Sequence, residues 1–190
     1  MSRNTPISYR HHSIKTLRNV SIWHAQAWRG KGREAKAVGD IYIGATLDAA
    51  VLAVKDFLDE QAAALRAKRG PSGFPCADEI RAALPQVPMN KSREAMLLAH
   101  LNAPDQILTA TELAQAAGYG DYSVANLQYG QLAFDLAQEL DWTPEEQTNG
   151  VTTWTFTLAD DADKQARKDG SEVPAQWRWQ LRPEVIEALS

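Results

Sequence analysis

The chain has 190 residues, of which 44% are hydrophobic and 23% are charged, and this composition excludes wholesale disorder. Its one cysteine, Cys76, excludes an internal disulfide framework and fits a reducing compartment. No apolar run approaches the roughly 20 residues that span a bilayer, and the N-terminal residues lack the apolar region of a secretory signal. We therefore expect a cytoplasmic protein that makes no membrane contact.

The formal net charge of −4 combines two halves of opposite sign. Residues 1–92 carry 14 Lys and Arg against 8 Asp and Glu, a net charge of +6. Residues 93–190 carry 6 against 16, a net charge of −10, and no Lys or Arg lies between Arg93 and Lys164. This asymmetry indicates two modules with different electrostatic roles.

The first module, residues 1–69, has the pattern of strands followed by a helix. Residues 13–28 are rich in β-branched and aromatic side chains, the Gly-containing segment 29–34 predicts a basic turn, and 38–43 predicts a return strand. Thr46 or Asp48 then caps a helix. Its apolar stripe has helical spacing and consists of Leu47, Val51, Val54, Leu58 and Leu65.

A segment rich in Pro and Gly, residues 70–91, follows the first module. It holds four prolines and two glycines, a composition that favours a linker with at most a short helix at 77–84. We therefore expect the second module to occupy residues 92–190.

The second module begins with three predicted helices, over 92–102, 110–117 and 122–140. Thr109 and Glu112 have the spacing of a capping box at the start of the middle helix. Gly118 follows that helix, where a turn with positive φ is expected.

Two predicted strands and a final helix complete the second module. Residues 151–158 and 176–181 alternate between apolar and polar side chains, which predicts a hairpin whose long polar loop spans 160–174. Trp154, Trp177 and Trp179 would fill the core face of this hairpin, and a cage for a modified base is the alternative. Pro183 then starts a short helix. This is the element order of a winged helix, so we expect an α+β fold: a small β-sheet-plus-helix module followed by a winged-helix module.

Three sequence strings carry a resemblance to a known domain. They are Ala-Thr-Glu-Leu-Ala-Gln-Ala-Ala-Gly-Tyr (110–119), Ser-Val-Ala-Asn-Leu-Gln-Tyr-Gly (123–130) and Gln-Trp-Arg-Trp-Gln-Leu-Arg-Pro-Glu-Val (176–185). Residues 93–190 thereby resemble a winged-helix-like accessory domain found with HNH-type, modification-dependent restriction endonucleases. The resemblance implies an association with foreign or modified DNA in restriction or in mobile elements, and it does not bring the nuclease with it.

The first module has a second resemblance. From Trp28 through Gly-Ala-Thr-Leu-Asp-Ala-Ala-Val-Leu-Ala (44–53), it is similar to the sheet-plus-helix of AP2-like and integrase-arm DNA-binding domains. The resemblance implies a three-stranded sheet that lies in the major groove of duplex DNA.

The candidate nucleic-acid-binding residues of the first module are basic side chains in or beside the predicted strands. They are Arg10, Lys15, Arg18, Arg29, Lys31, Arg33 and Lys36. Tyr9, Trp23 and Trp28 lie between them in the sequence, a mixture typical of surfaces that contact phosphates. A solvated sheet face is the alternative interpretation.

The helix predicted over 122–140 is the candidate recognition helix of a helix-turn-helix. Ser123, Asn126 and Gln128 would hydrogen-bond base edges, and Asn and Gln suit adenine. The net charge of −10 opposes this role, because phosphate contacts supply most non-specific affinity for DNA. Contact with a protein is equally open, and its candidate residues are Asp121, Asp135 and Glu139.

No pattern of catalytic or metal-ligating residues is present. The histidines near the N-terminus and Cys76 lack the paired spacing of zinc ligands, and the Asp160–Asp163 carboxylates lack the glycine and glutamate positions of a calcium loop. No nucleophile has an activating partner at a recognisable spacing. We therefore expect no enzyme, no metal and no cofactor.

Two hypotheses of different classes follow. The leading one is a non-enzymatic DNA-binding accessory protein linked to restriction or mobile elements, which binds duplex DNA, modified or not, through its basic sheet. Its acidic half would then contact a protein partner or self-associate. The alternative is an inhibitor from a phage or mobile element whose acidic half occupies the basic channel of a host nucleic-acid-targeting defence enzyme.

Overall fold

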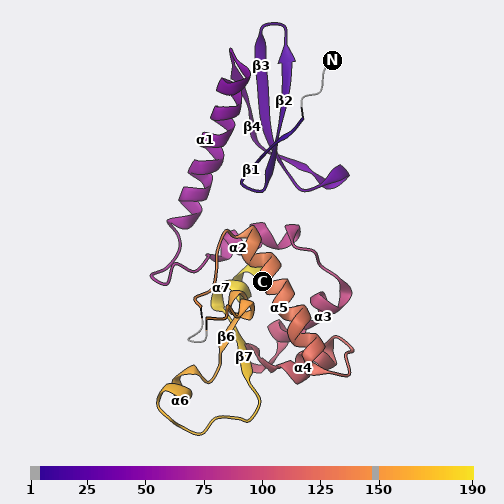
Figure 1. Cartoon of the computed structure of the whole chain (residues 1–190), viewed down its shortest axis with the longest axis vertical. Helices are drawn as coiled ribbons and strands as arrows, with labels where there is room; N and C mark the ends of the chain where they lie inside the picture. The colour runs from indigo at the N-terminus through magenta and orange to yellow at the C-terminus, as the bar shows by residue number, and fades with distance from the viewer. Residues whose placement is uncertain (1–4, 147–149) are drawn as a thin grey trace. The chain divides into compact units, whose positions relative to one another are not determined.

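The computed structural model describes residues 5–146 and 150–190, and the chain forms two compact units, Met1–Arg69 and Gly70–Ser190 (Figure 1). The protein is of the α+β class: each unit combines an antiparallel sheet with helices. Among the described residues, no helix combines the length and the apolar composition needed to cross a lipid bilayer.

The first unit is built on a four-stranded antiparallel sheet whose strands lie in sequence order. The strands are β1 (Ile7–Tyr9), β2 (His12–Asn19), β3 (Ile22–Arg29) and β4 (Lys36–Gly44). The pairing of β3 with β4 matches the predicted basic turn between two strands, whereas the pairing of β2 with β3 was not predicted. The strand β1 was not predicted from the sequence, because three residues are too few to show a period of two.

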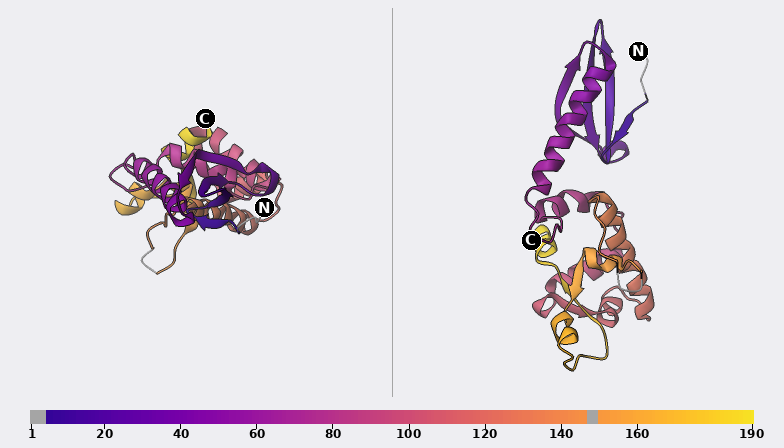
Figure 2. Two further views of the ribbon diagram at one scale, coloured as in Figure 1. Left: turned by 90° about the horizontal axis from the view of Figure 1, so that it is seen from above. Right: turned by 60° about the vertical axis from the view of Figure 1, so that its left-hand side comes forward.

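Helix α1 (Leu47–Arg66) covers one face of this sheet, as the right-hand view of Figure 2 shows. The hydroxyl of Thr46 accepts a hydrogen bond of 3.1 Å from the amide of Ala49 and so caps the helix. The predicted stripe forms the contact: Val51, Val54 and Leu58 are buried against Ile14 and two alanines of β3.

The β2–β3 turn contains a strained residue that could not be predicted from the sequence. Val20 has a φ of +54° and is 91% exposed. A β-branched residue rarely adopts this conformation, because its Cβ then crowds the following carbonyl group. Without Gly or Asn-Gly at this point, the sequence predicts one continuous β-rich segment over 13–28, whereas the chain turns back at Val20.

The second unit is mainly helical, with a three-stranded sheet of order β5-β7-β6. Its longer elements are α2 (Ala77–Ala83), α3 (Lys91–Asn102), β5 (Ile107–Thr109), α4 (Ala110–Ala116), α5 (Tyr122–Glu139), β6 (Ala159–Asp161), α6 (Lys164–Lys168), β7 (Arg178–Leu181) and α7 (Pro183–Leu189). Short 3₁₀ turns lie at Leu84–Gln86, Pro104–Gln106 and Trp154–Thr157.

The pair α4–α5 forms as the sequence predicts. Thr109 and Glu112 make the capping box, with the Glu112 carboxylate accepting from the Thr109 amide at 2.7 Å. Gly118 has a φ of +73°, and the amide of Tyr119 donates to the Ala114 carbonyl at 2.8 Å, which closes the helix end. Asp121 then caps α5.

The prediction of a strand over 151–158 is wrong. Residues 154–157 form a 3₁₀ turn packed under α5, where the Trp154 ring meets Phe134 edge-on at 4.7 Å. Thr155 and Thr157, which alternation places on the solvent side, are buried. The first strand of the hairpin is instead β6, and the predicted loop 160–174 contains α6.

Residues 70–91, predicted as a linker between modules, contribute to the core of the second unit. Phe74, Ile80 and Val87 are buried there, and α2 packs against α7 at the end of the chain. Phe74 also meets Trp142 edge-on at 5.0 Å. The prolines of this segment interrupt helices without keeping the segment out of the core.

A buried histidine joins three elements of the second unit. His100 of α3 donates from Nε2 to the carbonyl of Trp179 in β7 at 2.9 Å, so its Nδ1 is the acceptor that faces the Tyr129 hydroxyl of α5 at 2.7 Å. Burial lowers the pKa of His100 below its ordinary value.

The first prediction concerns the strained turn. Val20→Asn should raise the free energy of unfolding of the first unit by about 1 kcal/mol, because Asn tolerates positive φ and the exposed valine loses no packing. Urea unfolding measures the change. Ser21→Asn, at the adjacent turn position without positive φ, is the control and should be neutral. Equal effects of the two substitutions would contradict the strain at Val20.

The second prediction concerns His100. The folded state resists protonation of this imidazole, whereas the unfolded chain takes up the proton near pH 6.5. The free energy of unfolding should therefore fall as pH drops from about 7.5 to about 5.5. This loss should shrink in His100→Gln and persist in the exposed-site control His11→Gln. The same pH dependence in His100→Gln and in the wild type would refute the assignment.

Candidate nucleic-acid interface

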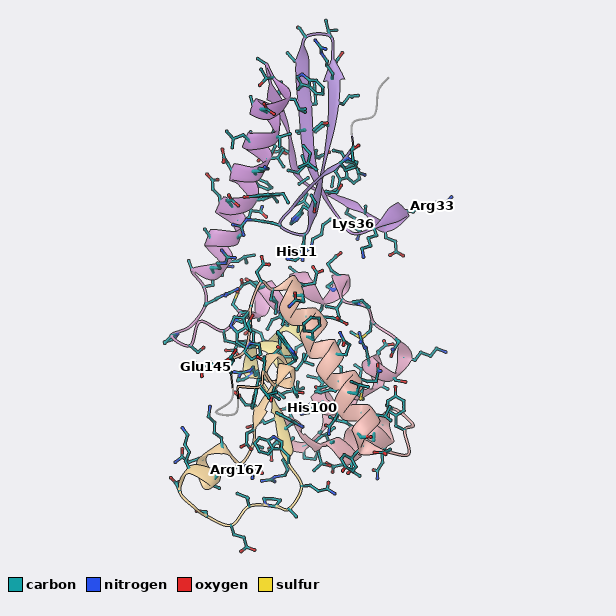
Figure 3. All side chains as sticks on the ribbon, viewed as in Figure 1. His11, Arg33, Lys36, His100, Glu145 and Arg167 are labelled. Atoms are coloured by element: carbon teal, nitrogen blue, oxygen red, sulfur yellow. The ribbon has the colours of Figure 1, made fainter. Side chains whose placement is uncertain are left out.

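Four of the predicted basic residues come together at the β3–β4 connection. Arg29 ends β3 and is the direct strand partner of Lys36, which begins β4. Lys31 precedes the 3₁₀ turn Gly32–Glu34, and Arg33 lies within it. Figure 3 shows Arg33 extending outward from the tip of this loop and Lys36 at its base.

Three of the four basic side chains at this connection are not neutralised by a neighbouring carboxylate of the described residues. Lys31, Arg33 and Lys36 are exposed, and within residues 5–146 and 150–190 none of the three has a carboxylate within 4 Å. Glu34 is the sole acidic residue between positions 29 and 39. We call Lys31, Arg33 and Lys36 the basic loop, a surface that can meet phosphates without first breaking an ion pair.

Arg10 is engaged within the first unit, unlike the cations of the basic loop. Its guanidinium forms an ion pair with Asp59 of α1, and the Tyr9 hydroxyl donates to the same carboxylate at 2.9 Å. The bond from Arg10, followed by that from Tyr9, holds the pKa of Asp59 below its ordinary value. The contact ties the β1–β2 turn to α1.

Lys15 and Arg18 lie on opposite faces of β2, so the predicted single basic surface is divided. Lys15 is on the face away from α1, where its ammonium group lies 3.8 Å from the centre of the Trp28 ring. Arg18 shares the face of Ile14, and its guanidinium lies 5.8 Å from the Trp23 ring.

Around Lys15 the face away from α1 is largely apolar. Its exposed aliphatic side chains are Leu17, Ile22, Ile41 and Ile43. This composition differs from that of the basic loop.

The arginines of the second unit are engaged internally. Arg93 pairs with Asp135 at 2.8 Å, Arg167 with Asp161 at 3.0 Å, and Arg182 with Asp160 at 2.8 Å. Two further pairs are Arg81 with Asp78 and Arg178 with Asp163, and the latter contact lowers the pKa of Asp163. Five of the eight basic side chains in residues 70–190 are therefore neutralised by their own unit.

The start of α5 presents a neutral surface. Ser123 and Asn126 are exposed, as predicted, and Gln128 is half-buried. They share this part of the helix with Tyr122 and Leu127, which are 59% and 67% exposed. The exposed apolar residues beside them were not singled out as a surface from the sequence, because a buried stripe on the same helix dominates the periodicity.

Two of the three carboxylates predicted to contact a protein have structural roles. Asp121 accepts a hydrogen bond of 2.7 Å from the Ser123 amide, which lowers the pKa of Asp121. Asp135 is held between Arg93 and the Gln131 amide. Glu139 is half-buried at the last position of α5.

No group of three or more His, Cys, Asp or Glu side chains in the described ranges is arranged to hold a metal ion. The chain matches no protein-family model, no curated protein and no solved structure.

Proposed function

We propose that this chain is a non-enzymatic DNA-binding accessory protein, linked to restriction or mobile elements, whose basic loop contacts the phosphates of duplex DNA. One observation carries the proposal: the cations of the basic loop have no carboxylate partner in the described part of the chain, while the arginines of Gly70–Ser190 are paired. Binding to DNA would release counterions at the loop without a compensating loss of ion pairs.

The second unit supports a different task within the same function. The order α3–β5–α4–α5–β6–β7, with β7 between β5 and β6, is that of a winged helix and favours this interpretation of the unit. Residues 70–190 carry 8 Lys and Arg against 18 Asp and Glu, a net charge of −10 that repels phosphate. We therefore assign contact with a protein partner to this unit, and DNA contact to the first unit, whose residues 1–69 carry a net charge of +6.

A second candidate function is the inhibitor of a host nucleic-acid-targeting enzyme. The observation that favours it is the exposed surface of α5, where Tyr122, Val124 and Leu127 combine with an acidic unit. An aromatic anchor on a unit of net charge −10 suits a basic groove that normally holds nucleic acid.

The third prediction tests the basic loop. Replacing Lys31, Arg33 and Lys36 together by Ala should lower the affinity for any duplex at least tenfold near 50 mM salt. It should also reduce the slope of log K against log salt by roughly 2.7, because each lost phosphate contact removes about 0.9. Fluorescence anisotropy with a labelled duplex at several salt concentrations measures both quantities.

The matched control removes the same charge from the other unit. Lys91, Lys164 and Lys168 are the basic residues of 70–190 outside the five arginine pairs, and replacing all three by Ala should leave the affinity and the slope unchanged. Equal losses in the two variants would show a non-specific effect of net charge. If the wild-type chain does not bind duplex DNA near 50 mM salt, the DNA-binding proposal fails and the inhibitor takes its place.

A further inference from the structure

The second unit contains a cavity to which neither proposed function assigns a ligand, although Tyr122 of the exposed α5 surface forms part of its wall. It has a volume of about 410 Å³ and lies between the first turns of α4 and α5 and the segment that enters β7. Besides two alanines, its lining side chains are Thr111, Tyr122, Asn126, Gln176, Trp177 and Trp179. The volume is in the range of about 300–1,000 Å³ that holds small molecules.

The aromatic walls of the cavity are held in place. Trp179 lies on the central strand β7, its carbonyl accepts the bond from His100, and Phe156 meets its ring edge-on at 5.5 Å. The Trp177 ring lies 5.6 Å from the Trp179 ring, and the Arg167 guanidinium lies 4.2 Å from its centre. Trp177 is nevertheless 41% exposed, so a ligand can reach it.

The polar groups of the cavity are neutral. Asn126 and Gln176 each offer an amide donor and acceptor, and Thr111 offers a hydroxyl. In the described part of the chain, neither amide side chain has a protein hydrogen-bond partner. Among the residues that the structure describes, no Lys, Arg, Asp or Glu lines the cavity, and Arg167, which contacts the Trp177 ring, is paired with Asp161.

We propose that this cavity binds an uncharged nucleobase. Aromatic rings stack on the faces of every base, and side-chain amides pair with the adjacent donors and acceptors on a base edge. A ligand phosphate would meet a unit of net charge −10 and no cation in the cavity wall, so the base is bound without phosphate contacts. This chemistry belongs to a free nucleoside and to a base exposed on a single strand.

The fourth prediction concerns nucleoside binding. Calorimetry measures the affinity of the whole chain for adenosine, guanosine, cytidine and thymidine, each at up to about 1 mM. At least one nucleoside should bind, and Trp177→Ala and Asn126→Ala should each weaken it, the former roughly tenfold or more. Both positions are exposed, so folding should be kept, and circular dichroism checks this. Trp23→Ala is the matched control, since Trp23 also lies beside an arginine but in the first unit.

Two further ligands separate the sources of the base. The monophosphate of the bound nucleoside should bind more weakly than the nucleoside. A single-stranded oligonucleotide is tested in the variant that lacks the basic loop cations. If it binds more tightly than the nucleoside and Trp177→Ala weakens this binding, the base comes from a single strand. If it binds more weakly than the nucleoside, the ligand is a free nucleoside. The proposal is overturned if no nucleoside binds, if both cavity variants keep wild-type affinity, or if the monophosphate binds more tightly. None of these outcomes depends on duplex binding by the basic loop.

Discussion

The second unit depends on the hydrogen bonds of one neutral imidazole. His100 lies in α3, and its two nitrogens face β7 and α5, so elements separated by 29 and 79 residues in the chain are fixed by a single side chain. A buried polar network of this kind adds stability only while every group is satisfied. The hydrogen bond from His100 therefore helps to hold the central strand β7, and with it the Trp179 ring that faces the cavity.

The two units differ in whether their basic side chains are paired with carboxylates. In the second unit, acidic residues outnumber basic ones, and its arginines serve to hold β6, β7 and the α6 loop together through Asp160, Asp161 and Asp163. In the first unit, the pair Arg10–Asp59 has a structural task, whereas the basic loop leaves its cations to solvent. The net charge of a unit does not show which of its cations have a structural role. The presence of a carboxylate beside a cation does show it.

Much of the fold could be predicted from local signals. The Thr109–Glu112 capping box, the turn at Gly118 and the stripe of α1 are each determined by a few neighbouring residues, and all three form as expected. The ion pairs Arg10–Asp59 and Arg93–Asp135 could not be predicted, because their partners are 49 and 42 residues apart in the chain. The strand prediction for residues 151–158 was wrong because it rested on local alternation alone. The alternation is typical of a strand, but packing under α5 buries the threonines.

The same distinction applies to the candidate sites. The basic loop was visible in the sequence because Lys31, Arg33 and Lys36 lie close together in the chain. For the cavity, the sequence offered a tryptophan cage only as the alternative to a core face, and it did not bring Asn126 to Trp177, because the two residues come from distant segments.

The two edges of the four-stranded sheet differ in a way that bears on self-association. The edge strand β1 has three residues, too few to template a neighbouring chain, whereas β4 has nine. The register of β4 against β3 shifts opposite Ala25 and Ala27, and Gly39, with a φ of +68°, lies in the interrupted stretch. An incoming strand would therefore meet two short, misaligned runs of backbone instead of one continuous edge. The irregularity protects a strand with the exposed side chains Ile41 and Ile43 from edge-to-edge polymerisation.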